Sequence, residues 1–235
     1  MLPTDAALLD NPAYASLCSG HARLAQVRGR ARRYPADVAP FLALPSPPSA
    51  QDWEDAAGLV APGSFVAGRY GAAELPDGWR AVQTFDLVQM IEERTSGMDC
   101  AEAVPLGPGD VPDMLELVAA TAPGPFLPRT IELGDYLGIR RDGALVAMAG
   151  ERFHLDGWTE ISAVCTKPDH RGQGLASQLT RALIAGIQRR SERAFLHVIS
   201  TNTGAISLYE ALGFRERQHA TLTVVMREPP GDAQT

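Results

Sequence analysis

Apolar residues recur at helical spacing in three stretches of the second half of the chain. In residues 174–190, leucine or isoleucine stands at every fourth position, which predicts a helix with one buried face. A similar pattern in residues 108–121 follows Asp110, a candidate N-cap. Residues 201–214 predict a shorter helix, because Gly213 suits the left-handed residue that ends many helices.

Between these helices lie apolar runs of strand length. Two of them flank Asp142-Gly143, a dipeptide typical of a tight β-hairpin. The predicted strands cover residues 101–107, the two arms of the hairpin within 136–153, 159–166, 194–200 and 219–226. The order β-α-β-β-β-α-β-α-β predicts an α/β (α+β) fold, with a mixed central sheet and helices on its faces.

The first hundred residues predict a smaller mixed α/β region. Apolar runs in residues 21–44, 63–71 and 79–91 indicate strands, and residues 51–60 fit a short helix after a proline-rich linker. The expected organisation is an N-terminal region at 1–99, a main domain at 100–228 and a frayed tail at 229–235.

Composition and charge narrow the class of partner. Of the 235 residues, 45% are hydrophobic, as is ordinary for a soluble protein with a buried core. The net charge of −7 disfavours nonspecific binding to nucleic acids or acidic membranes, because phosphate-rich partners favour basic surfaces. We see no signal peptide, and no apolar run approaches the roughly 20 residues that span a bilayer.

The cysteines indicate neither a metal site nor a disulfide framework. Cys18, Cys100 and Cys165 are widely spaced, and no Cys-x-x-Cys pair occurs, so we expect no zinc site. An odd count without framework spacing favours a reducing compartment. We therefore expect a cytoplasmic protein without a metal.

Candidate chemistry is concentrated where the strand at 159–166 leads into the helix at 174–190. Gly172 and Gly174 let the backbone approach a bulky anion, because neither residue carries a Cβ. The unpaired N–H groups and the dipole of a helix start favour negative charge, so a diphosphate fits this connection. A tight turn with a purely structural purpose is the alternative. The spacing matches neither the dinucleotide-binding nor the P-loop pattern.

Two motifs resemble those of the GNAT superfamily of acyl-CoA-dependent N-acyltransferases. Residues 171–176, Arg-Gly-Gln-Gly-Leu-Ala, are similar to the family's Arg/Gln-x-x-Gly-x-Gly/Ala signature. Residues 202–214 are similar to its second signature, a helix with Asn202 near the start, Tyr209 near the end and Gly-Phe after it. The resemblance covers roughly residues 101–228. The sequence is also similar to the branch of glycine N-acyltransferase C-terminal domains, which implies a degenerate GNAT-like half before the working domain.

The resemblance implies an acyl-CoA site along these motifs. In the family, the strand before the glycine turn diverges from its neighbour, and the pantetheine arm lies in the gap. Here this implies contacts to Val164, Cys165 and Thr166. Asn202 lies where the family often contacts the cofactor arm, although an N-cap role explains it equally well. The diphosphate is expected on the backbone of Arg171, Gly172, Gln173, Gly174, Leu175 and Ala176, with Ser177 close by.

The resemblance also implies direct attack of an amine on the thioester in a ternary complex. Tyr209 matches the family's usual general acid for the departing thiolate, with a packing role as the alternative. Glu160 is a candidate general base, because several relatives carry one on this strand. Four residues separate Glu160 from Val164, so a regular strand would place both on one face, roughly 13 Å apart at ~3.3 Å per residue. A water relay would therefore suit Glu160. His154 and His197 are further base candidates.

The predicted function is transfer of an acetyl group from acetyl-CoA to a primary amine. One alternative is an N-acyltransferase that uses another acyl-CoA and an amino-acid acceptor, whose carboxylate Arg129 would hold. Another is a non-catalytic acyl-CoA-binding module. The expected partners are acyl-CoA and a small amine, with no nucleic acid or membrane, and a homodimer is one option for the assembly.

Overall fold

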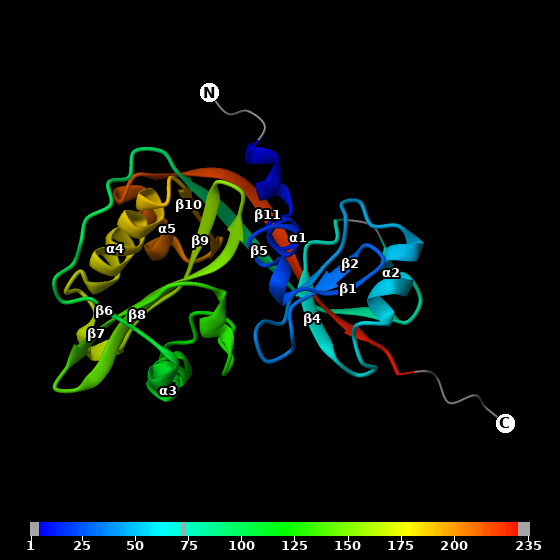
Figure 1. Ribbon diagram of the computed structural model, residues 1–235, viewed down its shortest axis with the longest axis horizontal. Coiled ribbons are helices and arrows are strands. Elements are labelled where there is room, and N and C mark those ends of the chain that lie inside the picture. The colour runs from blue at the N-terminus through cyan, green and yellow to red at the C-terminus, as the bar shows by residue number, and fades with distance from the viewer. Residues whose placement is uncertain (1–4, 72–73, 230–235) are drawn as a thin grey trace. The chain divides into compact units, whose positions relative to one another are not determined.

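The computed structural model describes residues 5–71 and 74–229, which group into two compact units (Figure 1). Within this range, the first unit contains residues up to 36, residues 40–87 and the chain from 219 onward, and the second contains residues 37–39 and 88–218. This grouping differs from the predicted division at residues 99 and 228. The reason is that strands β5 (Trp79–Glu92) and β11 (Phe214–Arg227) each contribute residues to both units, and β11 begins well before the predicted residue 219.

The first unit is built from short elements. Its helices are α1 (Pro12–Cys18), which was not predicted, and α2 (Ala50–Ala57). Its short strands are β1 (Gln26–Arg28), β2 (Ala31–Arg33), β3 (Leu42–Ala43) and β4 (Phe65–Gly68). Strands β1, β2 and β3 form an antiparallel sheet, and β4 pairs antiparallel with the end of β11. The predicted mixed α/β character of the N-terminal region is therefore present.

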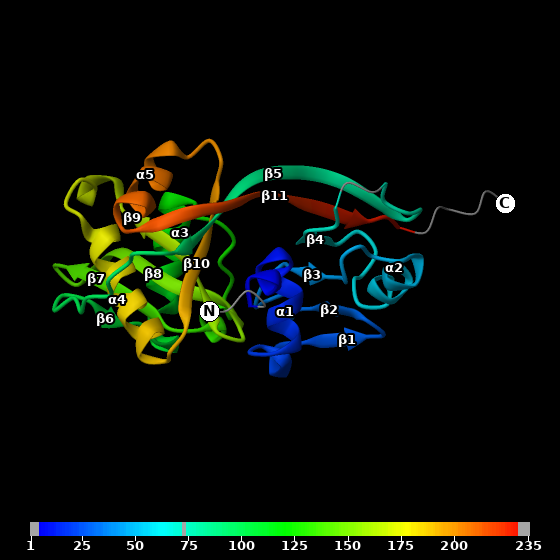
Figure 2. The ribbon, with the colours of Figure 1, turned by 90° about the horizontal axis from the view of Figure 1, so that it is seen from above.

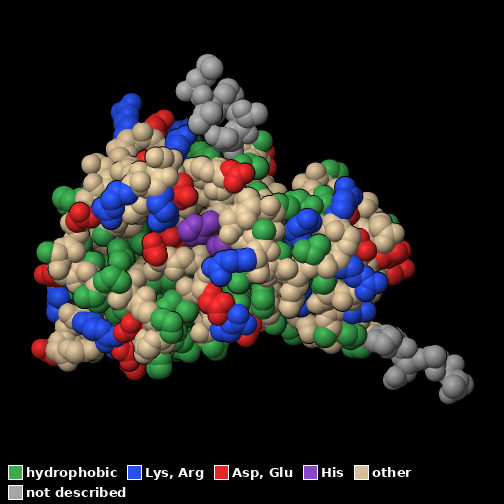
Figure 3. Space-filling view, viewed as in Figure 1, with side chains coloured by type: hydrophobic (Ala, Val, Ile, Leu, Met, Phe, Trp, Pro, Cys, Tyr) green, Lys and Arg blue, Asp and Glu red, His purple; other side chains and the backbone are tan. Residues whose placement is uncertain are grey.

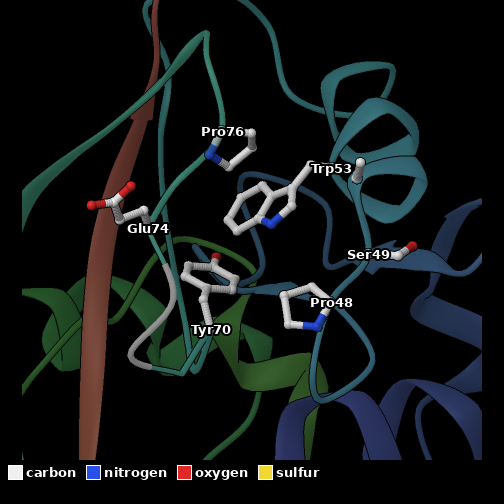
Figure 4. Close-up of a pocket in the computed structure, with 7 residues that line it drawn as sticks. Pro48, Ser49, Trp53, Tyr70, Glu74 and Pro76 are labelled. Atoms are coloured by element: carbon white, nitrogen blue, oxygen red, sulfur yellow. The ribbon is translucent and has the colours of Figure 1, made fainter.

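Aromatic side chains form the core of the first unit. The ring centroid of Trp53 lies 4.9 Å from that of Tyr70 and 5.1 Å from that of Trp79, within a buried apolar cluster. A pocket opens beside Trp53, and Figure 4 shows its ring between Pro76 and Tyr70, with the Glu74 carboxylate turned away from the ring. The core thus comes from α2, the strands and the loop before β5.

The second unit contains the predicted main sheet. Its elements are β6 (Val104–Pro105), α3 (Val111–Thr121), β7 (Tyr136–Arg141), β8 (Ala144–Leu155), β9 (Trp158–Thr166), α4 (Leu175–Arg189), β10 (Arg193–Ile199) and α5 (Thr203–Ala211). The strand order of the large sheet is β4-β11-β5-β10-β9-β8-β7-β6. Strand β10 is parallel to β9, whereas β8 is antiparallel to β9 and β7, so the mixed sheet is confirmed.

Helices cover both faces of this sheet in the second unit. On one face, α4 and α5 bury Leu179, Leu183 and Tyr209 against strand residues that include Ile161 and Leu196. On the other face, α3 buries Met114 and Leu117 in a separate apolar cluster. Figure 1 shows α4 and α5 on one side of the strands and α3 on the other. We call these two sides of the sheet the α4/α5 face and the α3 face. The candidate site includes residues from both.

The start of α3 and the end of α5 lie close to their predicted positions, but the residue before α3 does not make the capping contact that was expected. Asp110 precedes α3 as predicted, but its side chain makes no hydrogen bond that caps this helix. Its carboxylate accepts hydrogen bonds from the Gly107 N–H and from Arg140 instead, which fixes the preceding turn to β7. Gly213 follows α5 with φ +93°, the left-handed conformation that was predicted.

The N-terminus of α2 is held by reciprocal hydrogen bonds. The Ser49 hydroxyl accepts from the Asp52 N–H, and the Asp52 carboxylate accepts from the Ser49 N–H and from two nitrogens of Arg30. Burial alone would raise the pKa of Asp52, but the hydrogen bonds from Ser49 and Arg30 hold this pKa below its ordinary value. The carboxylate therefore stabilises the fold above the unfolded pKa near ~4, and this contribution is lost as the pH falls through the folded pKa.

Replacing Asp52 by alanine is expected to destabilise the first unit. The variant leaves the Ser49 N–H without its partner at the helix start, and we expect the free energy of unfolding to fall by about 1–2 kcal/mol at pH 7. Chemical denaturation followed by tryptophan fluorescence measures the change, because Trp53 lies one position along the helix. Glu54→Ala, at an exposed position of the same helix, is the matched control. An equal loss in both variants would contradict the assigned role.

Candidate functional site

Strands β9 and β10 are paired over only part of their lengths. The parallel register joins Trp158 to Arg193 and continues to Ile161 and Leu196, where it ends. Both strands continue beyond this point, β9 to Thr166 and β10 to Ile199. We call the opening beyond the last pair the strand fork. Main-chain groups on its two inner edges are not used by a β9–β10 ladder, so they can bind an extended ligand.

A β-bulge in β9 lies inside the strand fork. Cys165 pairs with Met148 and Ser162 with Gly150, so three steps along β9 correspond to two along β8. Ala163 has a φ of +53°, which is uncommon for a residue other than glycine. Such bulges bend a strand and reorient its side chains, and they are frequent next to active sites.

The bulge corrects one expectation from the sequence. Val164 packs against the apolar cluster of the α4/α5 face, whereas Glu160 lies on the α3 face, next to Ile161 in the strand but pointing the opposite way. The expectation that Glu160 and Val164 share one face is therefore wrong. The physical reason is the extra residue at Ala163, which reverses the alternation of side chains beyond it.

The turn from β9 into α4 leaves open space next to its backbone. Gly172 and Gly174 have φ of +77° and +74°, and Gly174 is the N-cap of α4. A Cβ on Gly172 would meet no protein atom within 4 Å, and one on Gly174 would meet only Gln178 Nε2, at 3.9 Å. No side chain caps this helix end. The first-turn N–H groups of α4 therefore face a space that suits a diphosphate.

The remaining residues of this turn are accessible. Arg171, Gly172, Gln173 and Gly174 are exposed, Ala176 and Ser177 are half-buried, and Leu175 is buried in the α4/α5 core. Arg171 donates through Nε to the Thr166 carbonyl at 3.4 Å. Lys167 forms an ion pair with Glu116 at 3.2 Å, so this lysine also links the turn to α3.

At the end of β9, the backbone rather than the side chains is available to a ligand in the strand fork. Thr166 pairs with Ala147 of β8 on one edge, which leaves the other edge toward the strand fork. The Cys165 side chain is buried on the α3 face. Burial raises the pKa of its thiol to about 11, despite hydrogen bonds from Thr121 and the Met148 backbone. Cys165 is therefore protonated at neutral pH and unsuited to act as a nucleophile.

Asn202 and Tyr209 both lie in the segment that follows β10. The Asn202 side chain accepts a hydrogen bond from the Ala205 N–H at 3.2 Å, so it caps α5. Tyr209 is 8% exposed and packs in the same apolar cluster as Val198 and Val164, beside the strand fork. Burial raises the pKa of Tyr209 to about 12, so its hydroxyl keeps its proton at neutral pH.

Glu160 lies on the opposite face and has no contact with solvent. Its carboxylate accepts from Arg152 Nε at 2.7 Å and Nη2 at 2.6 Å, and from His197 Nδ1 at 2.6 Å. Burial alone would raise the pKa of Glu160, but Arg152 and His197 together lower it to about 2. The carboxylate is therefore ionised at neutral pH. The water relay proposed for it from the sequence stays a prediction.

The hydrogen bonds of Glu160 continue across the sheet. His197 Nε2 lies 3.0 Å from Gln89 Nε2, and the Gln89 side-chain oxygen accepts from Arg217 at 2.9 Å. The polar row, as we call it, consists of Arg152, Glu160, His197, Gln89 and Arg217, one each from β8, β9, β10, β5 and β11. Arg152 enters it through a second bulge, since three steps along β8 from Glu151 to His154 correspond to two along β9.

Sequence reasoning found some of these residues and missed others. The predicted turn, Tyr209 and the end of β9 are brought together around the strand fork and the start of α4. Arg152 and Gln89 were missed. Phe195 and His197 alternate with apolar neighbours along β10, and this period of two could have indicated that both side chains lie on the α3 face. Arg129, the predicted carboxylate partner, is occupied by Asp37 and Glu132 of the protein itself.

Across residues 5–71 and 74–229, no group of three or more His, Cys, Asp or Glu side chains is arranged to hold a metal ion. Over the same residues, no helix has the length and apolar character needed to cross a membrane. Basic and acidic side chains are interspersed on the face of the molecule that Figure 3 shows.

Comparisons with known proteins identify relatives of this arrangement. The family described as "FR47-like protein" matches residues 136–223, which include β7 to α5 and most of β11. A crystal structure of a putative acetyltransferase from the GNAT family of Novosphingobium aromaticivorans is 36% identical, with a TM-score of 0.85. The match covers 94% of this chain and 99% of that one. The predicted fold class, a mixed sheet flanked by helices, is thereby confirmed.

Curated relatives match over shorter segments. The [ribosomal protein bS18]-alanine N-acetyltransferase of Escherichia coli is 34% identical over 79 residues, which is 33% of this chain and 53% of that protein. The uncharacterized N-acetyltransferase YobR of Bacillus subtilis is 36% identical over 61 residues, 26% of this chain and 25% of that protein. The chain thus spans about half or less of the length of these relatives.

The resemblance inferred from residues 171–176 and 202–214 is confirmed at the level of the superfamily, while the glycine N-acyltransferase branch stays a prediction. The prediction of an acetyltransferase enzyme is supported at the same level. Similarity over nearly the full length of both chains shows that this protein belongs to the GNAT family of acetyltransferases.

Proposed function

We propose that the protein transfers an acetyl group from acetyl-CoA to a primary amine, by direct attack of the amine on the thioester. The observation that carries this proposal is that β9 leads from the strand fork directly into the open glycine turn at the start of α4. An extended thioester arm fits the first, and a diphosphate fits the second. Family membership adds the reaction class, and the curated relatives are named as N-acetyltransferases.

The chain's own groups suit the two ends of the coenzyme. The pantetheine arm would pair with the backbone of Val164, Cys165 and Thr166, whose edge faces the strand fork. The diphosphate would lie on the N–H groups of residues 171–176, with the Ser177 hydroxyl and the Arg171 guanidinium nearby. The Asn202 side chain already caps α5. We therefore propose only that Asn202 lies beside the pantetheine arm, without a hydrogen bond from its side chain.

The chemistry needs three things from the protein: a proton acceptor for the amine, a donor to the developing oxyanion and a proton for the thiolate. A backbone N–H of Val164 or Cys165, turned by the bulge at Ala163, would supply the second, and such donors contribute roughly 3 kcal/mol in comparable sites. Tyr209, protonated and beside the strand fork, would supply the third. Glu160 and its partners on the α3 face would serve the first.

The acceptor is proposed to be a small primary amine. The ion pairs of Arg129 with Asp37 and Glu132 leave the amino-acid alternative without the carboxylate partner on which it depended. A longer acyl donor and a non-catalytic binding module have no observation in their favour. A homodimer and a cytoplasmic location stay predictions.

An acceptor screen tests the proposed function directly. The full chain is incubated with acetyl-CoA and a panel of primary amines that includes polyamines, amino acids and peptides with a free N-terminus. Release of free CoA thiol is measured, and mass spectrometry identifies the product. We expect acetylated amine in stoichiometric amounts with the released thiol. Tight binding of acetyl-CoA with no turnover across the panel would favour the binding module.

Adding a methyl group at Gly174 is expected to weaken coenzyme binding. Gly174→Ala places a Cβ in the space proposed for the diphosphate, and we expect the acetyl-CoA Kd to rise at least tenfold, measured by calorimetry. The positive φ also strains alanine, at a cost of about 1–2 kcal/mol in stability.

Gly143→Ala is the matched control for that strain. Gly143 lies in the β7–β8 hairpin with φ +81°, and its Cβ would meet nothing within 4 Å, compared with a single atom at 3.9 Å for Gly174. We expect a similar loss of stability with unchanged acetyl-CoA affinity. If both folded variants bind acetyl-CoA as the wild type does, the diphosphate site lies elsewhere.

Removing the Tyr209 hydroxyl is expected to slow the reaction without weakening coenzyme binding. Tyr209→Phe keeps the buried ring and deletes the proton donor, so kcat should fall by about 10² or more, while the acetyl-CoA Kd stays within a factor of about two. Tyr70→Phe, which removes a buried hydroxyl from the first unit, should keep wild-type kcat. Unchanged turnover in Tyr209→Phe would exclude the hydroxyl from the mechanism.

A further inference from the structure

The loop between β5 and β6, residues 93–103, is held against α4. The Met98 N–H donates to the Arg181 carbonyl at 3.1 Å. A Cβ on Gly97 would lie 2.4 Å from the backbone of Ala185, so only glycine fits at this close approach. These contacts to the helix fix where the following residues of the loop lie.

The same loop places Cys100 beside Gln178 of α4. Cys100 is half-buried and packs against the apolar cluster of the α4/α5 face. Its thiol donates to the Gln178 side-chain oxygen at 3.5 Å. Because the oxygen of the amide faces the thiol, the amide nitrogen, with its two N–H groups, faces away from the loop.

The Gln178 amide nitrogen lies next to the glycine turn before α4. Gln178 follows Gly174 by about one helical turn. Its Nε2 is 3.9 Å from the position that a Cβ on Gly174 would occupy. Within residues 5–71 and 74–229, Nε2 has no hydrogen-bond acceptor, although the side chain is half-buried. A ligand oxygen in this space can therefore accept from Nε2 at ordinary hydrogen-bond length.

This space is the one in which we place the diphosphate. Its ionised oxygens are acceptors only, so they bind best where several donors converge. The first-turn N–H groups of α4 approach from the helix start, and the exposed Arg171 adds a cation beside the turn. Gln178 is a side-chain donor from the helix itself, and it adds no charge.

We propose that the Gln178 side chain binds the diphosphate of the coenzyme through Nε2, and that Cys100 is a positioning residue that fixes the orientation of this amide. The inference rests on the proposed function and adds to it a contact outside residues 171–176 and 202–214. Without the thiol, the amide can rotate and present its oxygen to the phosphate oxygens, which repel it. Cys100 thus influences coenzyme affinity from a loop 78 positions earlier in the chain.

Calorimetry with acetyl-CoA and the full chain tests the contact. Gln178→Met keeps the length and the helix propensity of the side chain but removes the donor, so the acetyl-CoA Kd should rise about tenfold or more. Gln178→Glu replaces the amide by an ionised group of nearly the same shape, and we expect a larger rise because a carboxylate repels the diphosphate. If both folded variants keep the Kd within a factor of about two of the wild type, the proposal is wrong.

Gln188→Glu is the matched control, because it places the same charge on the same helix. Gln188 lies further along α4, roughly 15 Å away at ~1.5 Å per residue. This distance exceeds the Debye length of ~8 Å at physiological ionic strength. We expect an acetyl-CoA Kd like that of the wild type. An equal rise in both glutamate variants would assign the effect to net charge instead of to a contact, and would also overturn the proposal.

A second ligand separates the diphosphate from the other phosphate of the coenzyme. The 3′-dephospho form of acetyl-CoA retains the diphosphate and lacks the phosphate on the ribose. We expect Gln178→Met to weaken the binding of both ligands by the same factor. A loss seen with acetyl-CoA alone would place Gln178 at the ribose phosphate and contradict the assignment.

A double-variant cycle tests the role of Cys100. Cys100→Ala removes the thiol donor, and we expect the acetyl-CoA Kd to rise about threefold in the wild-type background but not in Gln178→Met, where there is no amide to orient. Cys100→Ser keeps a donor and should restore most of the affinity. An equal effect of Cys100→Ala in both backgrounds would overturn the positioning role.

Failure of the proposed function gives a different result. In that case the wild type would not bind acetyl-CoA, or would bind it without acetylating any amine in the screen. If the wild type binds and turns over acetyl-CoA while the Gln178 variants bind it equally well, only the contact to Gln178 is wrong.

Discussion

The short parallel pairing between β9 and β10 is the constraint on which the candidate site depends. Four residues of each strand are joined, ending at Ile161 and Leu196. A longer ladder would close the strand fork and consume the main-chain groups that an extended ligand needs. A shorter one would free His197 and Glu160 from their shared position. The bulge at Ala163 also keeps the ladder short, because a strand that bends away from its neighbour cannot continue to pair with it.

The two bulges act on opposite faces of the sheet. The one in β9 turns Val164 toward the α4/α5 core, and the one in β8 directs Arg152 to Glu160 on the α3 face. A buried carboxylate is costly unless it is paired and hydrogen-bonded, so Arg152 is what allows Glu160 to stand under the strand fork. The site therefore combines the apolar cluster of the α4/α5 face, the polar row and the uncapped N-terminus of α4, all within the second unit.

Local features of the site could be predicted from the sequence, and contacts between strands could not. The period of four in residues 174–190 and the glycines before it gave α4 and its turn, and Asp142-Gly143 gave the β7–β8 hairpin. The Glu160–His197 contact joins residues 37 positions apart, and it depends on strand order and register. Nothing in the side chain of Ala163 indicates a left-handed residue, so the bulge and the altered face of Val164 were missed. The start of β11 was placed too late because Arg215 and Glu216 are exposed and the first residues of this strand lack an apolar period.

The sheet itself separates Tyr209 from His197. The tyrosine belongs to the cluster beneath α4 and α5, and the histidine faces the side of α3. The two faces can therefore be altered separately. A substitution that repacks the apolar cluster around Tyr209 leaves the Glu160–His197 contact in place, so the effects of one change on each face should add in a double variant.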